Sequence, residues 1–167
     1  MPIRDALLPE FDHEMATTRR LLERVPEEKA AWKPHPKSFS LGDLSVHIAN
    51  LLTWLAMTLD RTELDLSPPG GEAFKSPRFE STSQLLATFD EGVRKARAAL
   101  AEVSDEDLRV PWTLKNAGTE IFTMPRVVTL RSFVFNHLIH HRGQLSVYLR
   151  LNDVPLPSIY GPTADES

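Results

Sequence analysis

Prolines divide the chain into segments, and this division constrains the fold more than any other feature of the sequence. The 13 prolines leave four long proline-free windows, at 10–25, 37–67, 78–110 and 126–154. Because proline lacks an amide hydrogen and clashes with the preceding turn, long helices are expected within such windows. Each window carries apolar residues at steps of three and four, the period of an amphipathic helix. The chain is therefore predicted to form four long helices.

Capping patterns indicate where these helices begin and end. Ser40 and Ser81 each precede an apolar period and are followed three residues later by an acidic or amide side chain, as in a capping box. Pro9 and Pro125 are expected in the first turns of the first and last helices, where a missing amide hydrogen costs nothing. Asn152 is expected to end the last helix in a left-handed conformation.

The connections between the helices are less regular. Residues 62–80 are rich in Pro and Gly, so they are expected to form a long surface connection. Residues 108–124 surround Ala117 and Gly118 with strand-forming side chains, which predicts either a short hairpin or a packed loop. Four helices with two long crossings predict an all-α four-helix bundle that is not simply up-down-up-down. At this length one domain, 1–167, with a single core is expected.

Composition excludes several classes of function. The absence of cysteine excludes disulfides, thiolate zinc sites, iron–sulfur clusters and a cysteine nucleophile, so a metal must be held by nitrogen and oxygen ligands. Lys and Arg number 19 against 23 Asp and Glu, which argues against nucleic-acid binding. No apolar run is long enough for a membrane span, and acidic residues and Pro9 occupy the place of a signal peptide. A cytoplasmic protein without a membrane partner is expected.

The last predicted helix carries two histidines with metal-ligand spacing. His137 and His141 are four residues apart, so their rings can point to one place, as a divalent metal requires. Both fall on the stripe that includes Val134 and Leu145, which is expected to be buried. His140 lies about 60–100° away around the helix and competes for the same role.

A third histidine, His47, lies on an apolar side of the second predicted helix. Two imidazoles from one helix and one from a facing helix would leave positions open for water or substrate, as in catalytic metal sites. The alternative is that these are core histidines satisfied by hydrogen bonds, or a pair spaced by chance. Leu138 stands where the metalloprotease motif HEXXH has its glutamate, so no carboxylate is placed as a base.

Several segments together resemble the DinB/YfiT-like family, over nearly the whole chain. The segments are Trp32-Lys33-Pro34, Ser38 to Leu44 followed by His47, His137 to Leu145, and Pro155 to Pro162. The resemblance implies an up-down-down-up four-helix bundle, often a homodimer, with a divalent metal ion such as nickel, zinc or manganese. It places the metal on His47, His137 and His141 and leaves His140 outside. Nothing in the sequence resembles the Y-family DNA polymerase that shares the DinB name.

The resemblance also implies a class of chemistry. Related proteins include thiol-dependent S-transferases and isomerases that use bacillithiol or mycothiol, with the metal proposed to activate the thiolate. The leading hypothesis is therefore a metal-dependent S-transferase or hydrolase that acts on a small molecule, with a low-molecular-weight thiol as the expected partner. The alternative is a non-catalytic stress-response or binding module with a structural metal or none. Asn50 and Gln144 are candidates to orient the ligands, and Tyr160 to cover the site.

Overall fold

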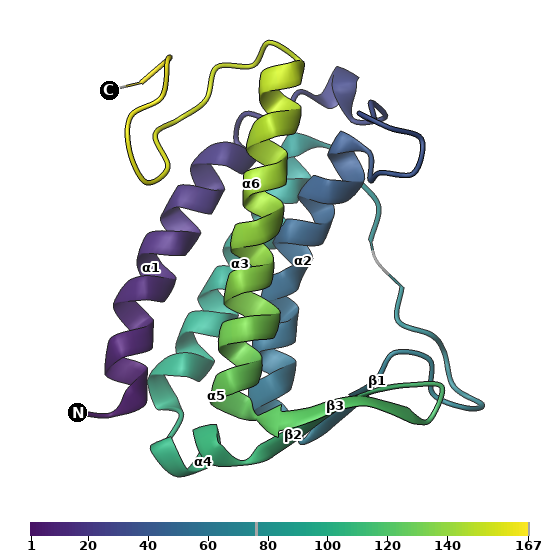
Figure 1. Ribbon diagram of the computed structural model, residues 1–167, viewed down its shortest axis with the longest axis vertical. Helices are drawn as coiled ribbons and strands as arrows, with labels where there is room; N and C mark the ends of the chain where they lie inside the picture. The colour runs from purple at the N-terminus through teal and green to yellow at the C-terminus, as the bar shows by residue number, and fades with distance from the viewer. Residues whose placement is uncertain (76, 167) are drawn as a thin grey trace.

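The computed structural model describes residues 1–75 and 77–166, and this part of the chain is mostly helical (Figure 1). The four predicted helices are present within it. Three are the continuous helices α1 (Ile3–Leu22), α2 (Leu41–Asp60) and α3 (Thr82–Glu102). The fourth is a rod in which α5 (Arg126–Thr129), the π-helical segment η2 (Leu130–Phe135) and α6 (Asn136–Leu151) follow without interruption. Two short helices, η1 (Glu27–Lys29) and α4 (Asp105–Arg109), lie in the connections.

The predicted helix starts are correct for α2 and α3 and wrong for α1. Ser40 Oγ accepts from the Asp43 amide at 3.0 Å, and Ser81 Oγ accepts from the Gln84 amide at 3.1 Å. α1 instead begins at Ile3, which places Pro9 inside the helix. The Ile3 amide donates to Asp105 Oδ1 at 2.7 Å, so this start is capped by a side chain about a hundred residues away.

The end of α6 also differs from its prediction by one residue. Asn152 has a φ of −106°, whereas the left-handed residue is Asp153, with a φ of 59°. The Asn152 side chain is engaged elsewhere, because its Nδ2 donates to the Tyr148 carbonyl at 2.9 Å. The helix is therefore closed by Asp153, which is also a residue type that tolerates this conformation.

A three-stranded sheet in the described residues corrects the prediction of an all-α fold. β1 (Glu63–Asp65) pairs in parallel with β2 (Pro111–Asn116), which pairs antiparallel with β3 (Thr119–Pro125). The predicted hairpin alternative is the correct one, and its turn holds Ala117 and Gly118 at φ values of 50° and 78°. Positive φ at both turn positions matches the twist of the strands. The sheet lies where α2 ends and α5 begins (Figure 1).

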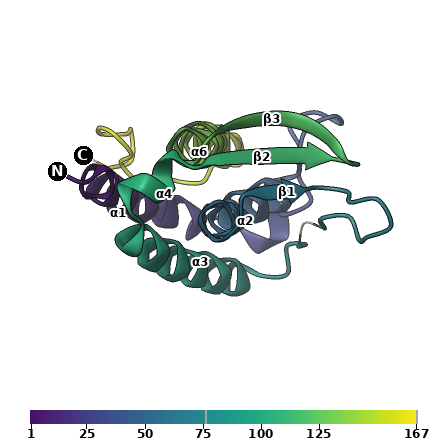
Figure 2. The same cartoon turned by 90° about the horizontal axis from the view of Figure 1, so that it is seen from below.

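The helices enclose one apolar core. α6 packs against α1 on one side and α2 on the other, and α3 packs against α1 and α2 (Figures 1 and 2). The fully buried side chains that form the centre include Phe11, Leu22, Leu44, Ile48, Leu55, Phe89, Leu138 and Leu145. This packing positions the first half of α2 beside α6. The up-down-down-up order of the helices stays a prediction.

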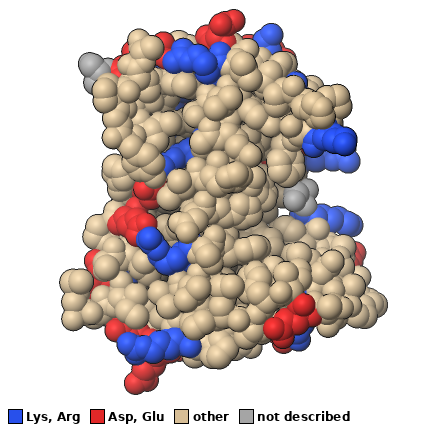
Figure 3. Space-filling view, in the orientation of Figure 1, with Lys and Arg blue, Asp and Glu red and all other residues tan. Residues whose placement is uncertain are grey.

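The surface agrees with the mixed charge of the sequence. On the face shown in Figure 3, blue and red side chains are interspersed, and a broad central area carries neither. None of the helices in the described part of the chain has the length and apolar character needed to cross a membrane.

Candidate metal centre

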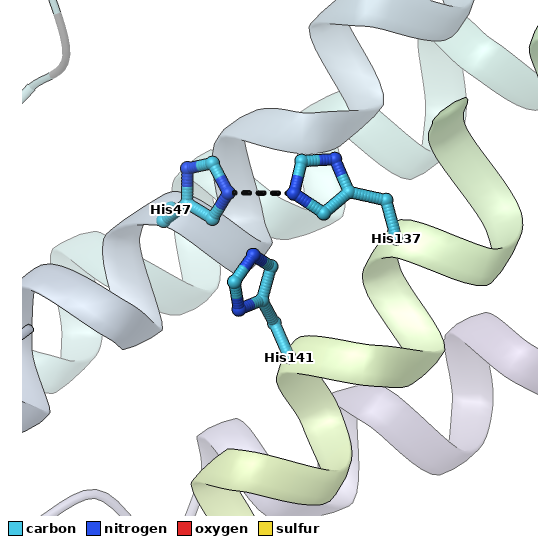
Figure 4. A group of neighbouring side chains, drawn as sticks. All are labelled: His47, His137 and His141. Carbon is cyan, nitrogen blue, oxygen red and sulfur yellow. Dashed lines mark hydrogen bonds between the residues drawn. The ribbon is translucent and has the colours of Figure 1, made fainter. Parts of the chain in front are cut away.

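Three histidine side chains meet between α2 and α6 (Figure 4). His47 comes from α2, and His137 and His141 come from successive turns of α6. One ring nitrogen of each lies within 4.8 Å of the corresponding atoms of the other two. The His47 and His137 Nε2 atoms are 3.3 Å apart. The structure therefore brings together the three histidines that the sequence singles out.

Hydrogen bonds from the opposite ring nitrogens orient the two histidines of α6. His137 Nδ1 lies 3.3 Å from the Phe133 carbonyl oxygen, and His141 Nδ1 lies 2.7 Å from Gln144 Oε1. Because both partners are acceptors, each Nδ1 carries the hydrogen and each Nε2 presents its lone pair to the cluster. Gln144 is thus an orienting partner, as the sequence predicts. Among the described residues Asn50 makes no hydrogen bond to His47, and its carbonyl accepts from Thr53 Oγ1.

Aromatic rings line the cluster. The Phe39 ring stacks on the His47 ring, with centroids 5.6 Å apart and an interplanar angle of 20°, and meets His141 edge-on at 6.2 Å. The Phe133 ring lies 5.6 Å from the His137 ring. Sequence reasoning missed both roles. The position of Phe39 in the sequence could have indicated its contact with His47. Phe39 directly precedes the residue that caps α2, and His47 lies within the first two turns of that helix.

Burial keeps the three imidazoles neutral. Burial, followed by the nearby rings of His141 and His137, lowers the pKa of His47 to about 4. Burial also lowers the pKa of His137 and that of His141, although the Phe133 carbonyl and Gln144 act in the opposite direction. Neutral imidazole is the form that binds metal ions. The cluster is therefore in the ligating form at neutral pH.

One pair of ring nitrogens in the cluster has the spacing expected for two ligands of one divalent cation. Two nitrogens bound to the same ion at about 2.0–2.1 Å lie roughly 2.8–3.4 Å apart for bond angles between a right angle and the tetrahedral value. The 3.3 Å between His47 Nε2 and His137 Nε2 falls in that range. Imidazole ligands suit zinc, nickel, iron and copper. The role of these residues as ligands stays a prediction, and the arrangement is compatible with it.

Comparison with known proteins gives the family. The model of the DinB superfamily matches residues 10–145. The chain belongs to the DinB superfamily. Within this DinB chain, the match includes all three histidines of the cluster.

Similar proteins match almost the full length of the chain, and the solved structures among them share its fold. The uncharacterized protein YrdA of Bacillus subtilis (strain 168) is 24% identical over 165 residues, which cover 97% of this chain and 90% of YrdA. The crystal structure of a DinB-like protein from Bacillus cereus ATCC 10987 has a TM-score of 0.69 at 22% identity, covering 93% of this chain and 97% of that one. The crystal structure of the DinB-like protein YjoA from Bacillus subtilis has a TM-score of 0.69 at 20% identity, covering 93% and 99%.

A pocket of about 260 Å³ adjoins the histidine cluster of this DinB protein. Its lining consists of Lys37, Ser38, Phe39, His141, Gln144 and Tyr148. Most of these side chains are polar, and Lys37 supplies a positive charge. Because His141 belongs both to the cluster and to this lining, a small molecule in the pocket lies beside the cluster.

The other candidates of the sequence lie outside the cluster. His140 is exposed and does not belong to the group of three, although its ring centroid is 5.0 Å from that of His141. The prediction that Tyr160 covers the site is wrong. Its hydroxyl lies 2.5 Å from Arg142 Nη2 and 2.9 Å from Glu14 Oε1, so it packs on the side of α6 that faces α1.

Proposed function

We propose that this protein is a divalent-metal-dependent enzyme that uses His47, His137 and His141 to hold the ion and acts on a small molecule. The observation that carries the proposal is the convergence of three neutral imidazoles beside a pocket of substrate size. Family resemblance favours nickel, zinc or manganese as the ion. Three protein ligands leave coordination positions for a reactant, whereas structural zinc sites are closed by four.

The bound ion supplies one kind of chemistry: held by three uncharged ligands it keeps its positive charge and lowers the pKa of a coordinated thiol or water. The chain's own residues prepare the site for it. Gln144 and the Phe133 carbonyl hold the Nδ1 protons of the α6 histidines in place. Phe39 shields one face of His47. Lys37 and Tyr148 line the adjoining pocket, where they can orient polar groups of a substrate.

A thiol is the preferred reactant, and water is the second. The chain contains no cysteine, so the sulfur of a transfer reaction must come from a substrate or cosubstrate. Lys37 in the lining of the adjoining pocket suits a low-molecular-weight thiol that carries an anionic group. We therefore place thiol-dependent S-transfer before hydrolysis. A non-catalytic stress-response or binding module with a structural metal or none is the alternative, and reaction assays distinguish it from an enzyme.

Metal content tests the proposal. Protein purified without an affinity tag and supplied with nickel, zinc or manganese should retain about one equivalent of one ion. The variant His137→Ala/His141→Ala should retain almost none, and the exposed histidines give a matched control, His13→Ala/His35→Ala, that should bind like the wild type. Wild-type protein far below one equivalent, or an unchanged content in the His137/His141 variant, would overturn the proposed site.

Reaction assays separate the two chemistries from the alternative. Metal-loaded protein is incubated with an anionic low-molecular-weight thiol and a chloronitrobenzene electrophile, and separately with an activated ester. Formation of the nitrophenyl thioether with release of chloride, faster than in the His137→Ala/His141→Ala variant, supports S-transfer, and ester cleavage above the same control supports hydrolysis. Neither activity in a protein with full metal content would favour the binding module.

We also propose that the protein forms a homodimer in the cytoplasm. Support comes from the solvent face of α6, where Val147 and Leu151 are exposed one turn apart. Exposed apolar side chains at adjacent turns are suited to burial against a second copy. Light scattering should give a molar mass of about twice the 18.8 kDa of one chain. The variant Val147→Glu/Leu151→Glu should give the mass of a single chain. A wild-type mass of one chain would contradict the proposal.

A further inference from the structure

Arg142, the residue after His141, is buried in an ion pair between α6 and α1. Its side chain is 1% exposed, and that of Glu14 is 8% exposed. Nη1 lies 2.6 Å from Glu14 Oε2. The same nitrogen donates to the Glu14 carbonyl at 3.2 Å and to Thr18 Oγ1 at 3.3 Å. One guanidinium nitrogen thus contacts a full turn of α1.

Tyr160 of the C-terminal segment contacts both members of this ion pair from the solvent side. Arg142 Nη2 donates to the Tyr160 hydroxyl at 2.5 Å, and the hydroxyl donates to Glu14 Oε1 at 2.9 Å. The guanidinium carbon lies 5.0 Å from the centroid of the tyrosine ring. We refer to Glu14, Arg142 and Tyr160 as the latch. Ion pairs of Arg150 with Asp165 and of Arg20 with Glu166 hold the segment that carries Tyr160.

The latch is a poor source of net stability. Removing two charges from water costs about as much as their attraction returns, and apolar replacements of buried ion pairs are often neutral or stabilising. What such a pair fixes is geometry, because each charge accepts few other partners in the interior. Here the geometry is the rotation of α6 about its axis and its position along α1.

That geometry is the one on which the histidine cluster depends. Consecutive residues of a helix differ by about 100° in direction, so His141 faces α2 while Arg142 faces α1. α6 lies between these two helices (Figure 1). A rotation or slide of α6 that would separate His137 and His141 from His47 would also pull Arg142 away from Glu14. Metal–ligand distances tolerate only about 0.2 Å, so a small displacement suffices to weaken the site.

We propose that Arg142 is a positioning residue and that the latch holds α6 in the register at which its two histidines face His47. This inference rests on the proposed metal site. It adds that metal binding also depends on contacts of Arg142, which lie on the other side of α6 from the histidines. The residues of the latch belong to α1, α6 and the C-terminal segment, and the histidines belong to α2 and α6. α6 is therefore the element through which one group acts on the other.

Cobalt binding tests the latch, because Co²⁺ reports both affinity and ligand geometry through its visible absorption. The variant Glu14→Met/Arg142→Met replaces the ion pair by apolar side chains of similar size and should keep the fold. Its affinity for Co²⁺ should fall about 10- to 100-fold, with shifted absorption bands, as when outer partners of metal ligands are lost. Tyr160→Phe removes only a hydroxyl from an exposed residue and should lower the affinity about threefold.

A core variant separates positioning from general destabilisation. Leu100 of α3 is fully buried and distant in sequence from the latch and the histidines, so Leu100→Ala should lower the melting temperature through a cavity. Its affinity for Co²⁺ at low temperature should stay within about twofold of that of the wild type, with the same absorption spectrum, because the contacts of the latch are unchanged.

The outcomes distinguish the two proposals. If the wild type binds Co²⁺ and the double variant binds it with the same affinity and spectrum, the latch has no positioning role and the metal site stands. If the double variant does not fold, an unchanged affinity in Tyr160→Phe overturns the latch in the same way. If the wild type binds no Co²⁺, Zn²⁺ or Ni²⁺, the proposed function fails and the positioning role fails with it.

Discussion

The two sides of α6 present opposite arrangements of hydrogen-bonding groups. On the side facing α1, the donors of Arg142 meet acceptors from Glu14 and Thr18, so the charges are matched within the protein. On the side facing α2, neutral imidazole nitrogens of His47, His137 and His141 converge on one another. A matched set of groups fixes a helix in place, whereas a set of converging imidazole nitrogens is suited to a cation. Adjacent residues of one helix therefore serve two different purposes.

Removing one member of the matched side should have the largest effect on stability. Glu14→Leu leaves the guanidinium of Arg142 buried without a carboxylate and should lower the free energy of unfolding by about 3–5 kcal/mol. Urea unfolding measures this change. As a control, Asp12 pairs with Arg97 at 2.8 Å on the surface, and Asp12→Ala should cost no more than about 1 kcal/mol. A loss for Glu14→Leu as small as that of the control would show that the two pairs are equivalent.

On the side facing α2, the loss of an orienting hydrogen bond should have an intermediate effect. Gln144→Leu deprives His141 Nδ1 of its acceptor and should weaken zinc binding about tenfold, or roughly 1.4 kcal/mol. Competition with a chromophoric chelator measures the affinity. Gln84→Leu on the exposed start of α3 changes the same residue type far from the cluster and should bind like the wild type. Equal affinities for the two variants would remove Gln144 from the site.

The smallest effect is expected at the C-terminal segment that supports the latch, and it depends on pH. The Arg150 guanidinium lowers the pKa of Asp165 from its usual 3.8, and the Ser158 amide lowers the pKa of Glu166 from its usual 4.5. Because both values are lower in the folded protein, the contacts are fully present above the usual values and are lost as the pH falls through the lowered ones.

Hydrogen exchange at Leu156 and Ser158 measures this change, because their amides donate to Asp165 and Glu166. Protection, corrected for the intrinsic pH dependence of exchange, should decrease on acidification below the usual carboxyl range. In Asp165→Asn/Glu166→Gln it should already be low at neutral pH and change little on acidification. Protection that is the same at neutral and acidic pH in the wild type would show that these carboxylates do not hold the segment.

Local patterns in the sequence predict the parts of the fold that local interactions determine. The caps at Ser40 and Ser81 place the starts of two helices because capping is a contact between residues three apart. The spacing of His137 and His141 predicts a shared direction for the same reason. In contrast, β1 pairs Glu63 with Thr113 across about fifty residues, and no local pattern in a Pro- and Gly-rich segment reveals such a pairing.

The latch was missed because its signal lies in two separate helices. Arg142 interrupts the leucine stripe of α6, and Glu14 stands beside Phe11 and Met15 in α1, so each is a charged residue on a buried face. Buried charges are nearly always paired. Two charges of opposite sign on buried faces of different helices therefore predict a contact, even when the sequence gives no distance between them.

The π-helical segment η2, directly before the first histidine of α6, also bears on the origin of the site. A π-turn closes its hydrogen bonds over one residue more than an α-turn, and here the Asn136 amide donates to the Arg131 carbonyl. If the same residues of η2 instead followed an ordinary α-helix, the rest of α6 would be rotated relative to α5 by about 100°, the step of one residue. The wider turn at this place thus decides which residues of the last helix face α2, and so whether this protein can gather its histidines at all.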